Sequence, residues 1–108
     1  MDTPLQLTFR HLDASDAVEQ RVNELASKLE RFYGGVTRCH VLFDAPSAHH
    51  HKGDRYSVRI ELGVPGRDII AHGSHDDIYV ALRQAFDLAQ RQLQQFSHTA
   101  ENSRGEPA

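Results

Sequence analysis

The chain has 108 residues, 39% of them hydrophobic and 25% charged, which is the composition of one ordinary soluble globular domain. One cysteine excludes an intrachain disulfide and fits a reducing cytosol, and no apolar run approaches the roughly 20 residues of a membrane span. Twelve basic against fifteen acidic residues give a net charge of −3, so bulk charge does not indicate nucleic-acid binding, and we expect no signal peptide.

The first half of the chain predicts a strand, a helix and a second strand. Residues 5–10 alternate between apolar and polar, which is typical of a strand with one buried face. Ser15 offers an N-cap to a helix whose apolar positions between residues 18 and 32 recur every three or four residues. Gly34-Gly35 is expected to end this helix in the left-handed conformation, and a second alternation follows over residues 36–43.

The second half predicts a hairpin and another helix. A polar connection over residues 45–54 leads to the clearest alternation of the chain, residues 56–64. Pro65-Gly66 suits a type II turn into a short fourth strand around residues 69–71. Helical spacing returns over residues 78–96.

The predicted order is therefore β-α-β-β-β-α, an α+β fold. Both helices have one apolar stripe and each strand has one apolar face, so we expect two helices packed on one face of a four-stranded mixed sheet. Residues 1–96 are predicted to form a single domain. The polar, aperiodic segment 97–108 is predicted to be a disordered tail.

Three stretches carry a resemblance to a known family. They are residues 28–33, Lys-Leu-Glu-Arg-Phe-Tyr; residues 77–82, Asp-Ile-Tyr-Val-Ala-Leu; and residues 91–93, Arg-Gln-Leu. With these stretches in register and the same element order over residues 5–96, the chain resembles the ribosome hibernation promoting factors, ribosome-associated inhibitors also described as sigma-factor modulation proteins.

The resemblance implies a cytoplasmic translation inhibitor, neither an enzyme nor dependent on a cofactor, that silences ribosomes in resting, stressed or stationary-phase cells. Family members bind the small ribosomal subunit where mRNA and tRNA would lie, chiefly through helix Lys and Arg on rRNA. Lys28 and Arg91 match family positions by register. The other expected rRNA contacts are Arg21, Arg31 and Arg83 on the same helices and Lys52 in the 45–54 connection. Neither a membrane nor DNA is an expected partner, and the protein is expected to be a monomer off the ribosome.

Two departures from the family pattern keep an alternative open. Short family members continue with several lysines after Arg-Gln-Leu, whereas this chain continues with Gln94-Gln95, and its tail carries Glu101 and Glu106. Because phosphate neutralisation supplies much of RNA affinity, the protein could instead be a protein-interaction regulator on the same fold that has lost ribosome binding. Long members add a C-terminal dimerisation domain; we expect none here, and hence no pairing of ribosomes by that route.

The helix charges also have a plainer interpretation. Arg21, Glu24, Lys28 and Arg31 fall on one shoulder of the first helix, and Arg83, Asp87 and Arg91 are spaced by four on the second. Such spacings are equally typical of solvated helices stabilised by ion pairs. The resemblance alone favours phosphate contacts.

The open face of the sheet is predicted to bind single-stranded RNA poorly. Its expected charged residues are Arg10, Arg38, His40, Arg55, Arg59, Glu61 and His72. Sheets that read single-stranded RNA display aromatic side chains for base stacking, whereas Phe9, Phe43 and Tyr56 fall on inward positions.

The histidine content is unusual. His49, His50 and His51 lie beside Lys52 and could contact RNA or a partner, bind a metal, or simply be solvated; no specific metal site is predicted. Protonation of all eight histidines would take the net charge from −3 to −3 + 8 = +5, so we expect acidification to tighten RNA binding, chiefly through this triplet. Cys39 is predicted to be a buried hydrophobe, and Asp76-Asp77 a helix-capping device.

Overall fold

The computed structural model describes the backbone of residues 4–45 and 55–105, and the side chains of these residues up to Phe96. The elements are β1 (Leu5–Arg10), α1 (Asp16–Phe32), β2 (Arg38–Asp44), β3 (Tyr56–Val64), β4 (Arg67–His75) and α2 (Ile78–Gly105). This order confirms the predicted α+β fold.

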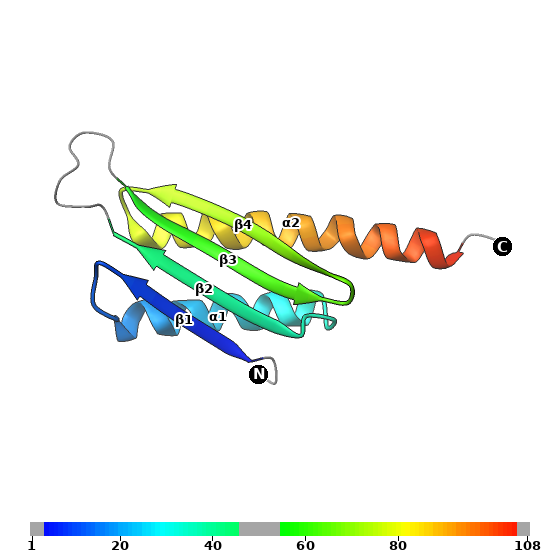
Figure 1. The fold of residues 1–108 in the computed structure, drawn as a ribbon, viewed down its shortest axis with the longest axis horizontal. Coiled ribbons are helices and arrows are strands. Elements are labelled where there is room, and N and C mark those ends of the chain that lie inside the picture. The colour runs from blue at the N-terminus through cyan, green and yellow to red at the C-terminus, as the bar shows by residue number, and fades with distance from the viewer. Residues whose placement is uncertain (1–3, 46–54, 106–108) are drawn as a thin grey trace.

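The sheet has the strand order β1-β2-β3-β4, with both helices behind it and its other face open (Figure 1). Strand β1 runs parallel to β2, as a strand–helix–strand crossover requires, and β2, β3 and β4 are antiparallel. The register places Val41 beside Ile60 and Ile60 beside Ala71, so that one row of apolar side chains crosses the sheet. All three are fully buried, and the core lies between this face and the helices.

The ends of α1 are set by local side-chain contacts. The Ser15 hydroxyl accepts a hydrogen bond from the backbone N–H of Val18 (3.3 Å), which confirms the predicted N-cap. The helix ends because Tyr33 is extended (φ −146°), so the prediction of a left-handed glycine end is wrong. The Tyr33 ring packs over Gly35, where a Cβ would lie 2.7 Å from the nearest ring atom.

The β3–β4 hairpin turns at Gly66, whose φ of +85° fits the predicted turn. Strand β4 is longer than predicted, spanning nine residues. Its extension through His72, Gly73 and Ser74 pairs residue by residue with β3. The sequence shows no apolar–polar alternation in this part of β4, because Gly73 stands at the inward position in place of an apolar side chain.

Helix α2 begins at a carboxylate cap. Asp77 Oδ1 accepts a hydrogen bond from the Tyr79 N–H (2.9 Å), which confirms the capping prediction for this residue. The helix continues to Gly105, whereas a disordered tail was expected from Ser97 onward. Residues 97–104 contain no glycine or proline, the residues that most strongly disfavour a helix, so the helix is not broken before Gly105. Within the part of the chain that the structure describes, no helix is long and apolar enough to cross a bilayer.

Candidate functional site

Helices α1 and α2 enclose a groove on the side of the molecule away from the open sheet face. Its apolar floor is formed by Leu25, Leu29 and Phe86. Its remaining lining residues are polar or charged: Arg21 and Lys28 from α1, and Arg83, Asp87 and Gln90 from α2. Arg21 and Lys28 lie two turns apart on α1, which places both cations along the same side of the groove. The structure thus brings together three of the predicted rRNA contacts.

The same cations continue onto the outer surface of α1. Arg31 lines a shallow depression there together with Arg21, Glu24 and Lys28, as the helical spacing predicted. Arg91 is exposed on α2 but is not among the residues that line the groove. The predicted contacts Lys52, His49, His50 and His51 lie outside the described residues.

Most of these helix cations lack a carboxylate partner among the side chains that the structure describes. Arg21 Nη1 contacts Glu24 Oε1 at 3.2 Å, both partly exposed. Among the described side chains, four helix cations form no ion pair: Lys28, Arg31, Arg83 and Arg91. Asp87 likewise pairs with neither Arg83 nor Arg91, so the ion-paired ladder considered for these three residues of α2 does not form. These cations are available to an external anion.

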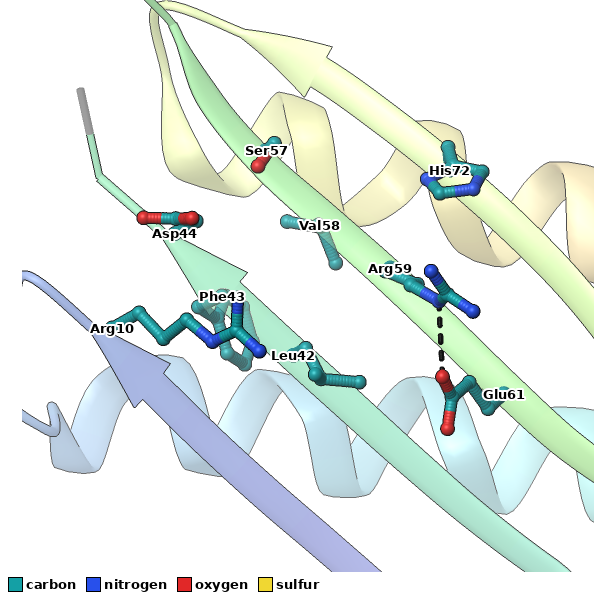
Figure 2. A pocket seen from close by; sticks show the side chains of 9 residues that line it. All are labelled: Arg10, Leu42, Phe43, Asp44, Ser57, Val58, Arg59, Glu61 and His72. Atoms are coloured by element: carbon teal, nitrogen blue, oxygen red, sulfur yellow. Dashed lines mark ion pairs between the residues drawn. The ribbon is translucent and has the colours of Figure 1, made fainter. Parts of the chain in front are cut away.

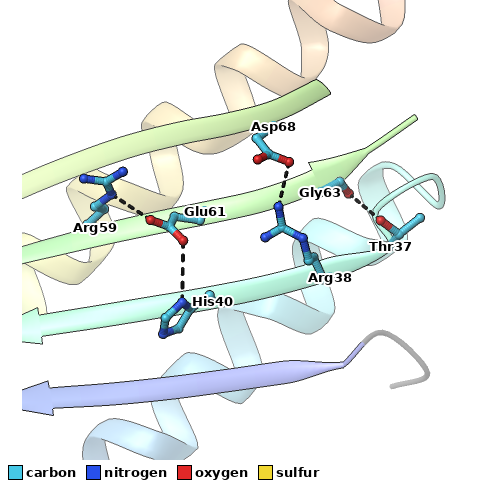
Figure 3. Close-up of polar contacts among 7 residues, drawn as sticks. All are labelled: Thr37, Arg38, His40, Arg59, Glu61, Gly63 and Asp68. Carbon is cyan, nitrogen blue, oxygen red and sulfur yellow. Dashed lines mark hydrogen bonds and ion pairs between the residues drawn. The ribbon is translucent and has the colours of Figure 1, made fainter. Parts of the chain in front are cut away.

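The open face of the sheet differs, because its charges pair with one another (Figure 3). Arg38 Nη2 lies 2.7 Å from Asp68 Oδ1, and Arg59 Nε lies 3.0 Å from Glu61 Oε2. Phe9 and Phe43, two of the three aromatic residues predicted to point inward, do so: their rings stack at 4.8 Å, and Phe43 is fully buried. The described part of this face therefore offers no aromatic platform for base stacking.

Neither metal nor thiol chemistry emerges from the described residues. They contain no group of three or more His, Cys, Asp or Glu side chains placed to hold a metal ion. Cys39 is buried as predicted, and desolvation raises the pKa of its thiol to about 12. A thiol with so high a pKa stays protonated and is a poor nucleophile.

The groove floor was only partly visible in the sequence. Phe86 was missed, although it follows the apolar Leu82 by four residues and is 4% exposed. The pairing of the two helices depends on distant contacts that no local pattern reveals. The Phe96 ring, for example, packs edge-on against Tyr33 at 6.0 Å and lies under the Arg67 guanidinium at 5.7 Å.

This architecture is shared with proteins of known structure. A ribosomal subunit interface protein from Coxiella burnetii superimposes with a TM-score of 0.71 at 21% identity, over 89% of this chain and 99% of that one. The N-terminal domain of Protein Y from Thermus thermophilus gives a TM-score of 0.72 at 22% identity, over 87% and 98%. These likenesses establish the fold.

The sequence identifies the family. Residues 5–100 match the family described as Sigma 54 modulation protein / S30EA ribosomal protein, so the chain belongs to it. A ribosome hibernation promotion factor from Deinococcus radiodurans is 31% identical over 91 residues, which are 84% of this chain but 47% of that protein. The ribosome-associated factor Y of Haemophilus influenzae is 25% identical over 94% of this chain and 90% of its own length. The resemblance seen in the sequence is confirmed, and the chain spans about half the length of the Deinococcus relative.

Proposed function

We propose that this protein is a ribosome hibernation factor that binds the small ribosomal subunit in the channel for mRNA and tRNA. The observation that carries the proposal is the groove between α1 and α2, whose cations Lys28 and Arg83 have no described carboxylate partner. The names of the relatives, ribosome hibernation and ribosome-associated factors, support the same role.

The groove suits an RNA backbone for electrostatic reasons. Binding a phosphate releases counterions from the RNA, and a cation already held by a carboxylate gains less from the exchange. The cations on the helix side are mostly unpaired, while those on the sheet side are mostly paired. A chain with a net charge of −3 can therefore still present one face that attracts RNA.

The mechanism is steric exclusion. The two helices, fixed to the sheet by a fully buried core, form a rigid body that occupies the space of mRNA and tRNA. Arg31, Arg91 and Lys52 are proposed as further phosphate contacts beside the groove. The protein would act in the cytoplasm as a monomer, without a cofactor or a catalytic step.

Co-sedimentation with purified small subunits at about pH 7.5 tests the proposal. The charge reversal Lys28→Glu with Arg91→Glu should abolish binding at low salt and leave the circular dichroism unchanged. The matched control, Arg38→Glu with Arg55→Glu, makes the same change of net charge on the open sheet face and should retain most of the binding. Binding that ignores both the helix reversals and the salt concentration would support the protein-interaction regulator instead.

A further inference from the structure

The histidines whose side chains are described, His11, His40, His72 and His75, lie on the sheet side of the molecule, away from the helix groove. His40 and His72 point to the open face from β2 and β4, and His11 follows β1 and contacts Asp44 at the end of β2. The fourth, His75, lies where β4 ends, and its Nδ1 accepts a hydrogen bond from the Asp77 N–H. These four titratable side chains are thus separated from the permanent cations of the groove between α1 and α2.

A hollow of about 300 Å³ lies in the open face (Figure 2). His72 lines this hollow, and His11 and His40 contact its two carboxylates. Its charged lining residues are Arg10, Asp44, Arg59, Glu61 and His72. The two guanidinium groups and two carboxylates cancel, so the hollow is close to neutral when its histidines are uncharged. Among the described residues, Arg10 forms no ion pair.

The carboxylates of the hollow each contact a histidine from outside it. His11 Nδ1 lies 2.9 Å from Asp44 Oδ1, and His40 Nδ1 lies 3.5 Å from Glu61 Oε1. His40 is further held by Thr8, whose hydroxyl lies 2.8 Å from Nε2. When these two histidines gain a proton, each becomes a cation beside its carboxylate and cancels its charge.

The third histidine adds charge to the hollow itself. His72 is exposed and shares the hollow with Arg10 and Arg59. Its protonation leaves three cations around the half-buried side chain of Leu42, while both carboxylates are neutralised from outside. Since histidine changes charge between about pH 5 and pH 8, mild acidification turns a neutral surface into a cationic one.

We propose that this hollow is a second RNA-binding surface, which holds phosphates of an RNA strand when the pH falls. The occupant is an RNA strand because the hollow is a shallow part of an open sheet. Its lining cations are Arg10, Arg59 and His72, and Arg10 forms no ion pair within the described residues. Lying opposite the helix groove, the hollow lets one molecule contact a second RNA segment.

The test measures binding of an unstructured oligouridylate of about 20 nucleotides, at fixed ionic strength, at about pH 7.5 and pH 6.0. All variants carry Lys28→Glu and Arg91→Glu, the charge reversal expected above to abolish binding through the helices, so that the result is independent of the function proposed above. In this background we expect affinity to rise about tenfold or more on acidification, with a steeper salt dependence at the lower pH.

Substitutions then locate the effect. His72→Gln with His40→Gln should remove most of the rise, whereas His75→Gln, a histidine outside the hollow, should preserve it. His72→Arg should already bind RNA more tightly at the higher pH. Affinity that stays flat with pH would overturn the proposal. So would a rise abolished only by replacing His49, His50 and His51, or uridine monophosphate binding as tightly as the strand.

Discussion

Gly73 of β4 lies directly against Ala81 of α2, with no room for a side chain between them. A Cβ at position 73 would lie 2.0 Å from the Ala81 carbonyl oxygen and 2.9 Å from the Ala85 nitrogen. Ala81 and Ala85 are themselves fully buried. Small residues at all three positions let the helix backbone approach the sheet, which explains the alanine in the segment Asp77–Leu82 that resembles the family signature.

Gly73→Ala should therefore destabilise the protein strongly. Backbone atoms of α2 must move to admit the methyl group, so we expect the free energy of unfolding to fall by about 3 kcal/mol or more. Urea denaturation followed by circular dichroism measures the change. Gly34→Ala is the control, because no atom lies within 4 Å of a Cβ there. Equal stabilities for the two variants would contradict the close approach.

Asp77→Ala should remove the N-cap of α2. The Tyr79 N–H would lose its partner at 2.9 Å, at an expected cost of about 1 kcal/mol of unfolding free energy. Asp76→Ala makes the same change one residue earlier, where the side chain is 80% exposed and reaches Arg55 only at 4.0 Å. That control should lose less than about 0.5 kcal/mol in the same denaturation experiment. A larger loss for Asp76→Ala than for Asp77→Ala would show that Asp76, and not Asp77, caps the helix.

Local patterns predicted the fold well because each element has a single apolar face. The alternation of β3 predicts its burial correctly, and the stripe of α1 does so as far as Leu29, since period alone decides which side chains face the core. The prediction fails at Phe32, which lies at the end of the helix and is 43% exposed. Contacts between distant residues are not encoded in this way. The end of α1 depends on Tyr33 packing over Gly35, and the length of β4 depends on a glycine pressed against α2.

The candidate site shows the same division. Helical spacing correctly placed Arg21, Lys28 and Arg31 on one surface of α1. It did not reveal that Arg83 faces two of them across a groove, because this requires the relative position of two helices. Nor could spacing decide between paired and unpaired cations, which depends on side-chain geometry.

The buried thiol of Cys39 should make the protein less stable in alkali. In the unfolded chain a cysteine ionises near its ordinary pKa of 9.0, whereas burial raises the pKa of Cys39 to about 12. Above the lower value the unfolded chain releases a proton that the folded chain retains, so rising pH favours unfolding. Between these two values the free energy of unfolding should fall by up to about 1.4 kcal/mol per pH unit from this group.

Comparison with Cys39→Ala isolates this contribution, since tyrosines and lysines titrate in the same range. The variant loses some packing at every pH, but the difference in stability between the two proteins should shrink as the pH rises above the ordinary value for cysteine. A difference that stays constant across the alkaline range would show that the folded and unfolded thiols ionise alike.

Asp87→Asn should strengthen binding to small ribosomal subunits. Asp87 lies in the groove between the helices with Arg83 and Lys28, yet it pairs with neither, so its charge only repels the phosphates that these cations attract. Its neutral amide keeps the shape of the groove and can donate a hydrogen bond to a phosphate oxygen. We expect the affinity to rise several-fold at low ionic strength and the rise to shrink as salt screens the interaction over about 10 Å at 0.1 M.

The control is Asp13→Asn, which makes the same change of net charge at an exposed residue outside the groove. Titration of both variants against subunits at about pH 7.5 should show the gain only for Asp87, and equal gains would mean that net charge, not the groove, governs the affinity.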